Sequence, residues 1–471
     1  ALRYTLDFDD YGVRLPYHEY LALADKAGGI SEDYIQDIAV TVNEPELRDG
    51  FTYVAKHVDD DQAIYLLMKI RRSLLKIQEH ALLEEYDVEQ QLDHIDELLE
   101  HTWLKRGYFP GLKSLLLSIP DINGNYRKQV NSLLGVIDLA DSECVAQMVT
   151  AIDGRKFDGF DEFDGLFDEL AEFLEQAVLS AEEFLRLAAL NLTEHQFSMI
   201  RGERGVDCSL QEIASNPYLL YEEYEPPYDL EDQKSGEKID GVIDLFKIDL
   251  SLFPQVKYLK RIEGFHDWKV TDRRRLRSVV MSILKSRESQ GDCYLETRLI
   301  EKAVEKYPLF YKFNSEYSIG ESLANPSEDT ANHFKEKIVF RSLFDSKVYY
   351  LKELYDDEVL IADEINTLCH NEPYKNEVSS LTADLDISIT ELTKKIGSTF
   401  DADQFKQERR DLYSTILNRS VTILTGSPGS GKSYELLKVI DYFNKNSEVS
   451  QVLTLTGKAA LRLRKNGEGF K

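Results

Sequence analysis

The chain has 471 residues, a length that favours two to four domains, and 42% of its residues are hydrophobic, enough for a buried core. No run of about 18 apolar residues occurs, and the first residues lack a basic segment followed by an apolar one, so the sequence predicts neither a membrane span nor a secretory signal. The net charge of −29 excludes a uniformly basic nucleic-acid binder.

The charge is divided unequally along the chain. Residues 1–250 carry 52 acidic and 22 basic side chains, a balance of −30. Residues 251–471 carry 33 acidic and 34 basic side chains, a balance of +1. A phosphate backbone would therefore be repelled by the first region and tolerated by the second.

The cysteines give no sign of a metal or redox site. They are separated by 64, 85 and 76 residues, a spacing that matches no zinc or redox motif. Scattered thiols of this kind are typical of a protein in a reducing compartment, so we expect a cytoplasmic location. The four residues are Cys144, Cys208, Cys293 and Cys369.

The first half of the chain has the pattern of a helical protein. From about residue 60 to residue 102, apolar residues recur near a period of 3.6, which predicts an amphipathic helical stretch. Further helices are expected near residues 126–150, 158–178 and 180–190, with glycine and proline between them. Residues 1–55 give no firm prediction.

Residues 157–184 form an acidic segment that allows two interpretations. The segment holds ten acidic side chains and no basic one, with phenylalanines at intervals of three to six residues. The first interpretation is an amphipathic helix with a solvated acidic face. The second is a surface that binds a protein partner or mimics DNA. The aspartates lack the spacing of a calcium-binding EF-hand loop.

A basic segment follows an acidic connector at residues 222–240. Residues 257–287 carry ten lysines and arginines against three acidic residues, with aromatic residues between them. Such a segment could bind phosphates and stack on bases, or it could be a helical surface that balances the acidic half. The arginines that we single out as candidate DNA contacts are Arg273, Arg274, Arg275 and Arg277.

A nucleotide-binding motif lies near the C-terminal end of the sequence. Residues 426–433 match G-x-x-x-x-G-K-[ST] at every fixed position. An apolar, β-branched run at 421–425 predicts a strand before the loop, and residues 434–443 read as a helix after it. A second strand is expected at 451–456. The motif residues are Gly426, Ser427, Pro428, Gly429, Ser430, Gly431, Lys432 and Ser433.

Each residue type in the motif has a chemical role. Glycines let the backbone bend around an anion, and the following helix directs the positive end of its dipole at the phosphates. Lys432 would reach the β- and γ-phosphates of ATP, which makes it the candidate catalytic residue, and the Ser433 hydroxyl would ligate Mg²⁺. The sequence therefore predicts ATP and Mg²⁺ as cofactors.

The loop and the residues after it resemble motifs I and Ia of RecD-like superfamily 1 DNA helicases. The second motif of that family runs threonine-glycine-basic-Ala-Ala and then Arg-Leu, as residues 456–463 do here. The resemblance implies that Thr456, Gly457 and Lys458 contact single-stranded DNA. It also implies a glutamine that contacts adenine upstream of the loop, for which Gln407 is the better match and Gln404 the second choice.

Weaker matches to the long form of this family lie upstream, in the expected order. They are the Asn-Pro-Tyr segment at 213–220, a helix at 273–284 that leads to a turn at 291–295, and a helix from residue 348 to residue 362 before the motor. Asp292 replaces the family's histidine in the turn, and the helix-hairpin-helix glycines are not evident. We divide the chain into an acidic helical domain (1–190), a helical pre-motor region (191–395) and the start of a RecA-like motor domain (396–471).

The expected fold class is mostly α in the N-terminal and middle regions, followed by a partial α/β P-loop domain of the RecA-like kind. No Asp-Glu pair follows a strand after the loop, although hydrolysis needs such an acid to hold Mg²⁺. Asp363 and Glu364 precede the loop in a predicted helix and are not assigned to this role. We therefore expect this sequence to be the N-terminal portion of a helicase, inactive alone.

The predicted function is that of an ATP-dependent helicase or translocase, moving 5′ to 3′ as the resemblance implies, on single-stranded DNA or duplex ends. An alternative is a nucleotide-binding interaction module, in which the acidic residues 1–190 recruit a protein partner and the P-loop acts as a switch. A nuclease-linked ATPase is a third reading, but no metal-dependent nuclease pattern is found.

Overall fold

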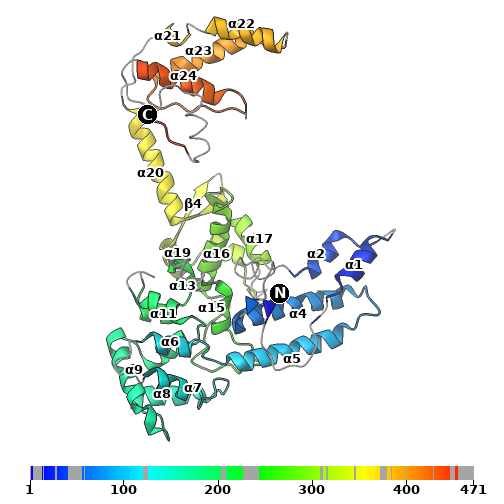
Figure 1. Cartoon of the computed structure of the whole chain (residues 1–471), viewed down its shortest axis with the longest axis vertical. Helices are drawn as coiled ribbons and strands as arrows, with labels where there is room; N and C mark the ends of the chain where they lie inside the picture. Colours follow the sequence, from blue (N-terminus) through cyan, green and yellow to red (C-terminus); the bar gives the residue numbers. More distant parts are fainter. Residues whose placement is uncertain are drawn as a thin grey trace. The chain divides into compact units, whose positions relative to one another are not determined.

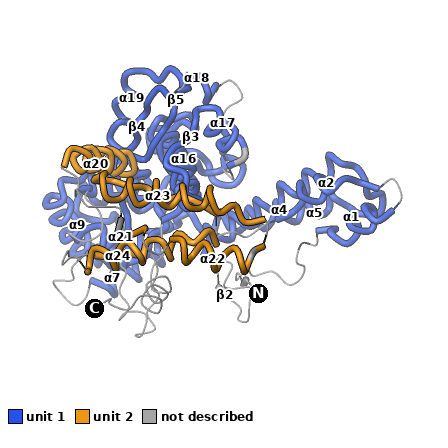
Figure 2. The backbone as a smooth tube through the Cα atoms, turned by 90° about the horizontal axis from the view of Figure 1, so that it is seen from above, with its two compact units in different colours: residues 1–352 blue, residues 353–471 orange. Residues whose placement is uncertain are grey.

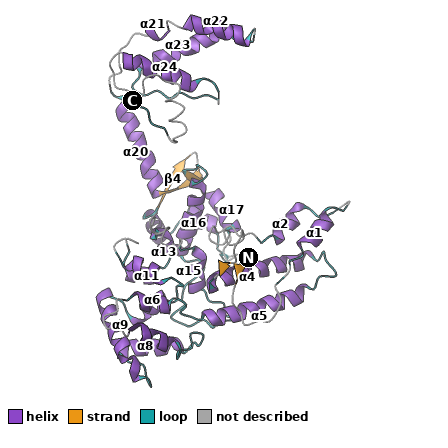
Figure 3. Cartoon of the chain, viewed as in Figure 1, coloured by secondary structure: helices purple, strands orange, loops and turns teal. Residues whose placement is uncertain are grey.

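The computed structural model is mostly helical in the residues that it describes, and this confirms the predicted fold class in its main feature (Figures 1 and 3). The chain divides into two compact units, residues 1–352 (unit 1) and residues 353–471 (unit 2), coloured separately in Figure 2. The described residues are 2–3, 13, 15–26, 29–40, 56–57, 59–119, 126–202, 208–225, 243–307, 311–313, 317–343, 346–371, 379–382, 385–397, 399–427, 429–445 and 451–454.

Unit 1 begins with a two-stranded parallel pairing and helices that pack as antiparallel neighbours. The long stretch predicted at 60–102 is two helices, because Ala81 adopts a left-handed conformation (φ 51°) that ends the first of them. A capping box of Asp59 and Gln62 fixes where that helix begins. The elements are β1 (Leu2–Arg3), α1 (Tyr17–Ala24), α2 (Glu32–Ile38), β2 (Lys56–His57), α4 (Asp60–His80) and α5 (Val88–Arg106).

The middle of unit 1 is a set of short helices whose apolar faces pack together. Ser180, Thr193 and Ser209 each cap a helix through a capping box, so these helices begin where the sequence places a hydroxyl residue three positions before Glu or Gln. The elements are α6 (Leu112–Ser118), α7 (Tyr126–Leu134), α8 (Cys144–Gly154), η2 (Asp161–Phe163), α9 (Asp164–Ala177), α10 (Ala181–Ala188), α11 (Glu194–Arg201), α12 (Leu210–Ser215) and α13 (Leu219–Glu223).

The acidic segment 157–184 forms the amphipathic structure of the first interpretation. Phe163 and Phe167 are fully buried, and Phe157 stacks on Phe167 with ring centroids 6.0 Å apart. Seven of the ten acidic residues are exposed, and the other three, Asp164, Glu169 and Glu183, are half-buried. The apolar side of the segment is therefore core. Binding of a protein partner to its acidic side stays a prediction.

The last part of unit 1 contains the long helix α16 and a three-stranded antiparallel sheet of order β3-β5-β4. Figure 2 labels the helix and the three strands. In this sheet Tyr349 pairs with Leu295 on one side and Phe340 on the other. α16 packs against α13, α17, α19, β3 and β5. The elements are α15 (Leu245–Leu252), α16 (Arg273–Glu288), β3 (Tyr294–Glu296), α17 (Thr297–Lys306), α18 (Ile319–Ala324), α19 (Glu328–Lys335), β4 (Ile338–Leu343) and β5 (Ser346–Leu351).

The helix predicted from residue 348 onward is corrected by the sheet. The run from Val348 to Leu351 belongs to β5, and the helix α20 begins only at Lys352. Val348, Tyr349 and Tyr350 are buried in the strand, where β-branched and aromatic side chains pack well. Asp363 and Glu364 lie in α20, as expected.

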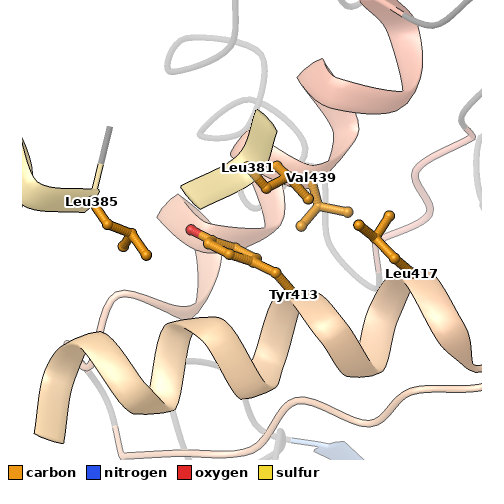
Figure 4. Packing of buried hydrophobic residues seen from close by; sticks show 5 residues of the cluster. All are labelled: Leu381, Leu385, Tyr413, Leu417 and Val439. Carbon is orange, nitrogen blue, oxygen red and sulfur yellow. The ribbon is translucent and has the colours of Figure 1, made fainter. Parts of the chain in front are cut away.

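Unit 2 is an assembly of helices around a small apolar core. Figure 4 shows the side chains of this core, which are Leu381, Leu385, Tyr413, Leu417 and Val439. The elements of the unit are α20 (Lys352–Cys369), which starts at the boundary with unit 1, α21 (Ser379–Thr382), α22 (Leu385–Ile396), α23 (Ala402–Asn418) and α24 (Lys432–Lys445). The three-domain division drawn from charge and motifs stays a prediction.

No described helix has both the length and the apolar character needed to cross a membrane. No group of three or more His, Cys, Asp or Glu side chains in the described parts of the chain is arranged to hold a metal ion.

Candidate nucleotide-binding site

The P-loop connects the region after α23 to the start of α24. Its lysine and serine, Lys432 and Ser433, are the first two residues of α24, so the predicted order of loop and helix is confirmed. The Tyr434 and Glu435 N–H groups both donate to the Gly431 carbonyl, at 2.9 and 3.1 Å, and these bonds close the first turn. N–H groups at the very start of a helix have no acceptor within it, which leaves this end able to bind an anion.

The strand predicted before the loop is not formed. Residues 421–427 are described and are neither helix nor strand, and the same holds for residues 451–454, the described part of the second predicted strand. A strand exists by pairing, and no described segment pairs with either run. Each run has a strongly exposed apolar residue, Ile423 at 79% and Leu453 at 84%.

Two glycines of the loop hold a backbone conformation that other residues rarely adopt. Gly429 has φ +82° and Gly431 has φ +87°, and a Cβ added at either position would have no atom within 4 Å. The requirement for glycine is therefore one of backbone angle and not of space. The turn is tightened by a hydrogen bond of 3.2 Å from the Ser430 N–H to the Ser427 carbonyl.

The lysine of the motif reaches back over the loop. Lys432 Nζ donates to the carbonyl oxygens of Gly426 at 2.5 Å and Ser427 at 2.9 Å. A lysine ammonium is a compact charge with three donors, so it can exchange such carbonyl acceptors for phosphate oxygens. The Ser433 side chain is exposed beside it. Pro428 lies outside the described residues.

α24 is held against α23 by the apolar core and by one buried polar contact. Tyr413 and Leu417 of α23 and Val439 of α24 belong to the same core (Figure 4). At the loop end, Glu435 is only 5% exposed; Arg409 Nε lies 3.2 Å from its Oε1, and the Tyr413 hydroxyl donates to its Oε2. This contact could not be predicted from the sequence, because Tyr413 and Arg409 precede Glu435 by 22 and 26 residues and no motif links them.

The candidate adenine-contacting residue is exposed on α23. The Gln407 side-chain amide donates to Asp411 on the same helix at 2.9 Å. Arg409 faces α24. Two residues of an α-helix rotate by roughly 200° around its axis, so Gln407 projects from nearly the opposite side of α23. The second choice, Gln404, is exposed as well and donates to Glu408 at 3.1 Å. The role of Gln407 stays a prediction.

The structure corrects the expected surface position of two of the four arginines of α16. Arg275 is fully buried, with Nη2 2.6 Å from Asp249 Oδ2, and Arg277 is equally buried, with Nη2 2.6 Å from Glu222 Oε2. Arg277 Nη1 also contacts Glu336 Oε2 at 2.5 Å. Both guanidinium groups form ion pairs with carboxylates, so they balance charge inside unit 1 and are not exposed at the surface.

The other two arginines remain at the surface. The Arg273 side chain is 48% exposed and lies 3.4 Å from the Asp329 carboxylate. The Arg274 side chain pairs with Asp272 and lies over the Trp268 ring at 3.8 Å. A phosphate contact by Arg273 or Arg274 stays a prediction. Thr456, Gly457 and Lys458, the candidate contacts in the second motif, lie outside the described residues.

The comparison with protein families identifies the class of this site. Residues 409–469 match a family model described as an AAA domain (AAA_19), a P-loop ATPase domain of the kind found in helicases. The match contains the loop and α24, and it begins within α23. No curated protein and no solved structure gives a significant match to the chain. The chain therefore carries a helicase-type P-loop ATPase domain at residues 409–469.

Proposed function

We propose that the protein is an ATP-dependent DNA helicase or translocase. The observation that carries the proposal is the loop itself. Lys432 lies across two loop carbonyls at the start of α24, within a segment that matches a helicase-type ATPase domain. In that family class, ATP hydrolysis drives movement along a nucleic acid, and the resemblance in the motifs implies single-stranded DNA with 5′ to 3′ movement.

Different residues of the loop and of the first turn of α24 would bind the phosphates and the Mg²⁺ of the nucleotide. Lys432 binds the β- and γ-phosphates, and the first N–H groups of α24 bind the same anion. The Ser433 hydroxyl suits Mg²⁺, which usually takes one or two protein oxygens together with phosphate oxygens. When bound, Mg²⁺ neutralises developing charge on the phosphates. Gln407 is proposed to contact adenine.

The DNA contacts are proposed for two surfaces. Thr456, Gly457 and Lys458 would touch the single-stranded backbone, as the resemblance implies. Arg273 and Arg274 would add a second contact in unit 1, because their side chains are partly exposed. Arg275 and Arg277 are not part of this proposal.

The test is the ATPase activity of the full-length protein with and without single-stranded DNA. We expect stimulation by DNA, and loss of activity in Lys432→Ala together with Mg²⁺-ATP binding more than about tenfold weaker, because a charge-assisted contact to phosphate is lost. The control is Lys406→Gln, which breaks the ion pair between Lys406 on α23 and Asp386 on α22. Activity that ignores DNA, or that survives Lys432→Ala, would contradict the proposal.

The second candidate is a nucleotide-binding interaction module. It is favoured by the acidic segment 157–184, in which seven of the ten acidic residues are exposed. A salt titration of DNA binding separates the two candidates. A helicase should lose affinity steeply as salt rises, because phosphate contacts release counterions, whereas the interaction module should show little DNA affinity at any salt concentration.

A further inference from the structure

A buried carboxylate lies in the first turn of the helix that starts at the P-loop. Glu435 is the third residue after Lys432 and is 5% exposed. Its N–H donates to the Gly431 carbonyl at 3.1 Å, so its backbone is tied to the last glycine of the loop. An acidic side chain here opposes the binding of phosphates, because both carry negative charge and burial weakens the screening between them.

Two side chains of α23 compensate this charge. Arg409 and Tyr413 are four residues apart, on one face of the helix. Arg409 Nε lies 3.2 Å from Glu435 Oε1, and the Tyr413 hydroxyl donates to Oε2, so each carboxylate oxygen has its own partner. Burial and the neighbouring carboxylate raise the pKa of Tyr413, which therefore remains a hydrogen-bond donor.

The Arg409 guanidinium is itself fixed by its surroundings. Its Nη1 lies 3.1 Å from Glu408 Oε2, and its Cζ lies 3.9 Å from the centroid of the Phe405 ring. The Arg409 side chain is 15% exposed. A guanidinium that is stacked, paired on two sides and partly buried loses little entropy when it holds a carboxylate.

We propose that Arg409 is a positioning residue for the nucleotide phosphates. It neutralises Glu435, anchors the first turn of α24 to α23, and so keeps Lys432 and the loop N–H groups effective for an anion. Tyr413 fixes the second oxygen of the same carboxylate. This inference rests on the proposed nucleotide-binding function of the loop.

The proposal predicts effects of opposite sign for the two partners of the ion pair. Arg409→Gln leaves Glu435 uncompensated beside the phosphates, and we expect the Kd for AMP-PNP with Mg²⁺ to rise about tenfold. Glu435→Gln keeps an oxygen acceptor for Tyr413 but removes the negative charge, so its Kd should equal that of the wild type or fall below it. A contact that only stabilises the fold would weaken binding in both variants.

Two further variants test charge separately from shape. Arg409→Lys keeps the positive charge and should bind the nucleotide nearly as the wild type does. The double variant Arg409→Gln/Glu435→Gln removes both charges, and binding should return to within about threefold of the wild type, since no uncompensated charge remains.

The matched control is Leu417→Ala. Leu417 lies on α23 in the same buried core, and removing its side chain creates a cavity that should lower the Tm. Its Kd should stay within about twofold of the wild type, because the Arg409–Glu435 pair is intact. All binding is measured well below the Tm of each variant.

The outcomes separate the inference from the proposed function. If the wild type fails to bind AMP-PNP with Mg²⁺, the proposed function fails. If the wild type binds and Arg409→Gln binds equally well, the inference is overturned. It is also overturned if Arg409→Gln, Glu435→Gln and Leu417→Ala all weaken binding in proportion to their loss of Tm.

Discussion

Arg275 and Asp249 form a fully buried ion pair between α16 and α15. Three hydrogen bonds join them: Arg275 Nε donates to Asp249 Oδ1 at 2.9 Å and to Oδ2 at 3.2 Å, and Nη2 donates to Oδ2 at 2.6 Å. The Tyr218 hydroxyl donates to the same Oδ1 at 2.8 Å. The Arg275 guanidinium also donates to the carbonyls of Val270 and Tyr311. All polar atoms of the pair are thus satisfied, as burial of two charges requires.

Removing one partner of this pair should destabilise unit 1. We expect Arg275→Met to lower the free energy of unfolding by about 3–5 kcal/mol, because it leaves Asp249 as an uncompensated buried charge. Tyr218→Phe should cost less, about 1.5–3 kcal/mol, since one hydrogen bond to a charged group is lost. Chemical denaturation followed by circular dichroism measures both.

The surface arginine of the same helix provides the control. Arg273→Gln breaks a solvent-exposed pair with Asp329 and should change stability by less than about 1 kcal/mol. Equal stability of Arg275→Met and Arg273→Gln would show that the buried pair does not hold α16 to α15.

Acid should weaken unit 1 through His266, which is buried, and His333, which is half-buried. Burial and the positive charge of Arg277 lower the pKa of His333 to about 4, and burial lowers the pKa of His266 to about 4 as well. His333 Nδ1 lies 3.2 Å from Arg277 Nη1, so the ring must be neutral to accept that hydrogen bond; Glu336 is 3.7 Å away.

The sign of the pH effect follows from proton binding. Between pH about 6.5 and about 4 the unfolded chain binds a proton at each of these histidines and the folded chain does not, so stability falls as pH falls through this window. We expect His333→Gln to remove on the order of 1–2 kcal/mol of the loss between pH 7 and pH 4.5. An unchanged slope in His333→Gln would contradict the assignment.

The helices and the loop could be predicted because their signals are local. A 3.6-residue apolar period, hydroxyl caps and the glycine-lysine motif each lie within a few residues of what they determine. The motif therefore gave the loop and the start of α24 correctly. The break at Ala81 was missed, since a left-handed alanine has no sequence signature of its own.

The partners of buried charges could not be predicted, because they lie far apart in sequence. Arg275 and Arg277 looked like surface bases within a basic run, yet their carboxylate partners are 26 and 55 residues away. The strand at 421–425 failed for a related reason. An apolar β-branched run favours a strand, but a strand also needs a neighbouring strand to pair with. No described segment pairs with residues 421–425.

If Arg273 contacts a phosphate, its removal should change the salt dependence of DNA binding. We expect Arg273→Gln to weaken binding of a single-stranded oligonucleotide of any sequence and to reduce the salt slope by about 1, the signature of one lost phosphate contact. Fluorescence anisotropy across a salt series measures the slope. Lys406→Gln, which removes an exposed base in unit 2, tests whether the loss of any positive charge has the same effect.

The last prediction concerns backbone strain in the P-loop. Gly431→Ala adds a Cβ that has no atom within 4 Å, so any effect must come from the φ of +87° that the position requires. An alanine resists this angle by about 1–2 kcal/mol, and the loop should relax to another conformation. Because the Tyr434 and Glu435 N–H groups both donate to the Gly431 carbonyl, this relaxation should fray the first turn of α24. The Kd for AMP-PNP with Mg²⁺ should therefore rise by about tenfold or more.

The control for this substitution is the same change in a helix. Gly165 lies in the first turn of α9, where an added Cβ would make only an ordinary contact, 3.9 Å from Gln129 Nε2, and its φ is in the ordinary range, so Gly165→Ala should stabilise unit 1 by up to about 1 kcal/mol. Gly165→Ala should leave nucleotide binding unchanged. A loop that tolerates Gly431→Ala with unchanged Kd would show that its glycine angles are not needed for the anion, and the role assigned to this turn would then have to be given up.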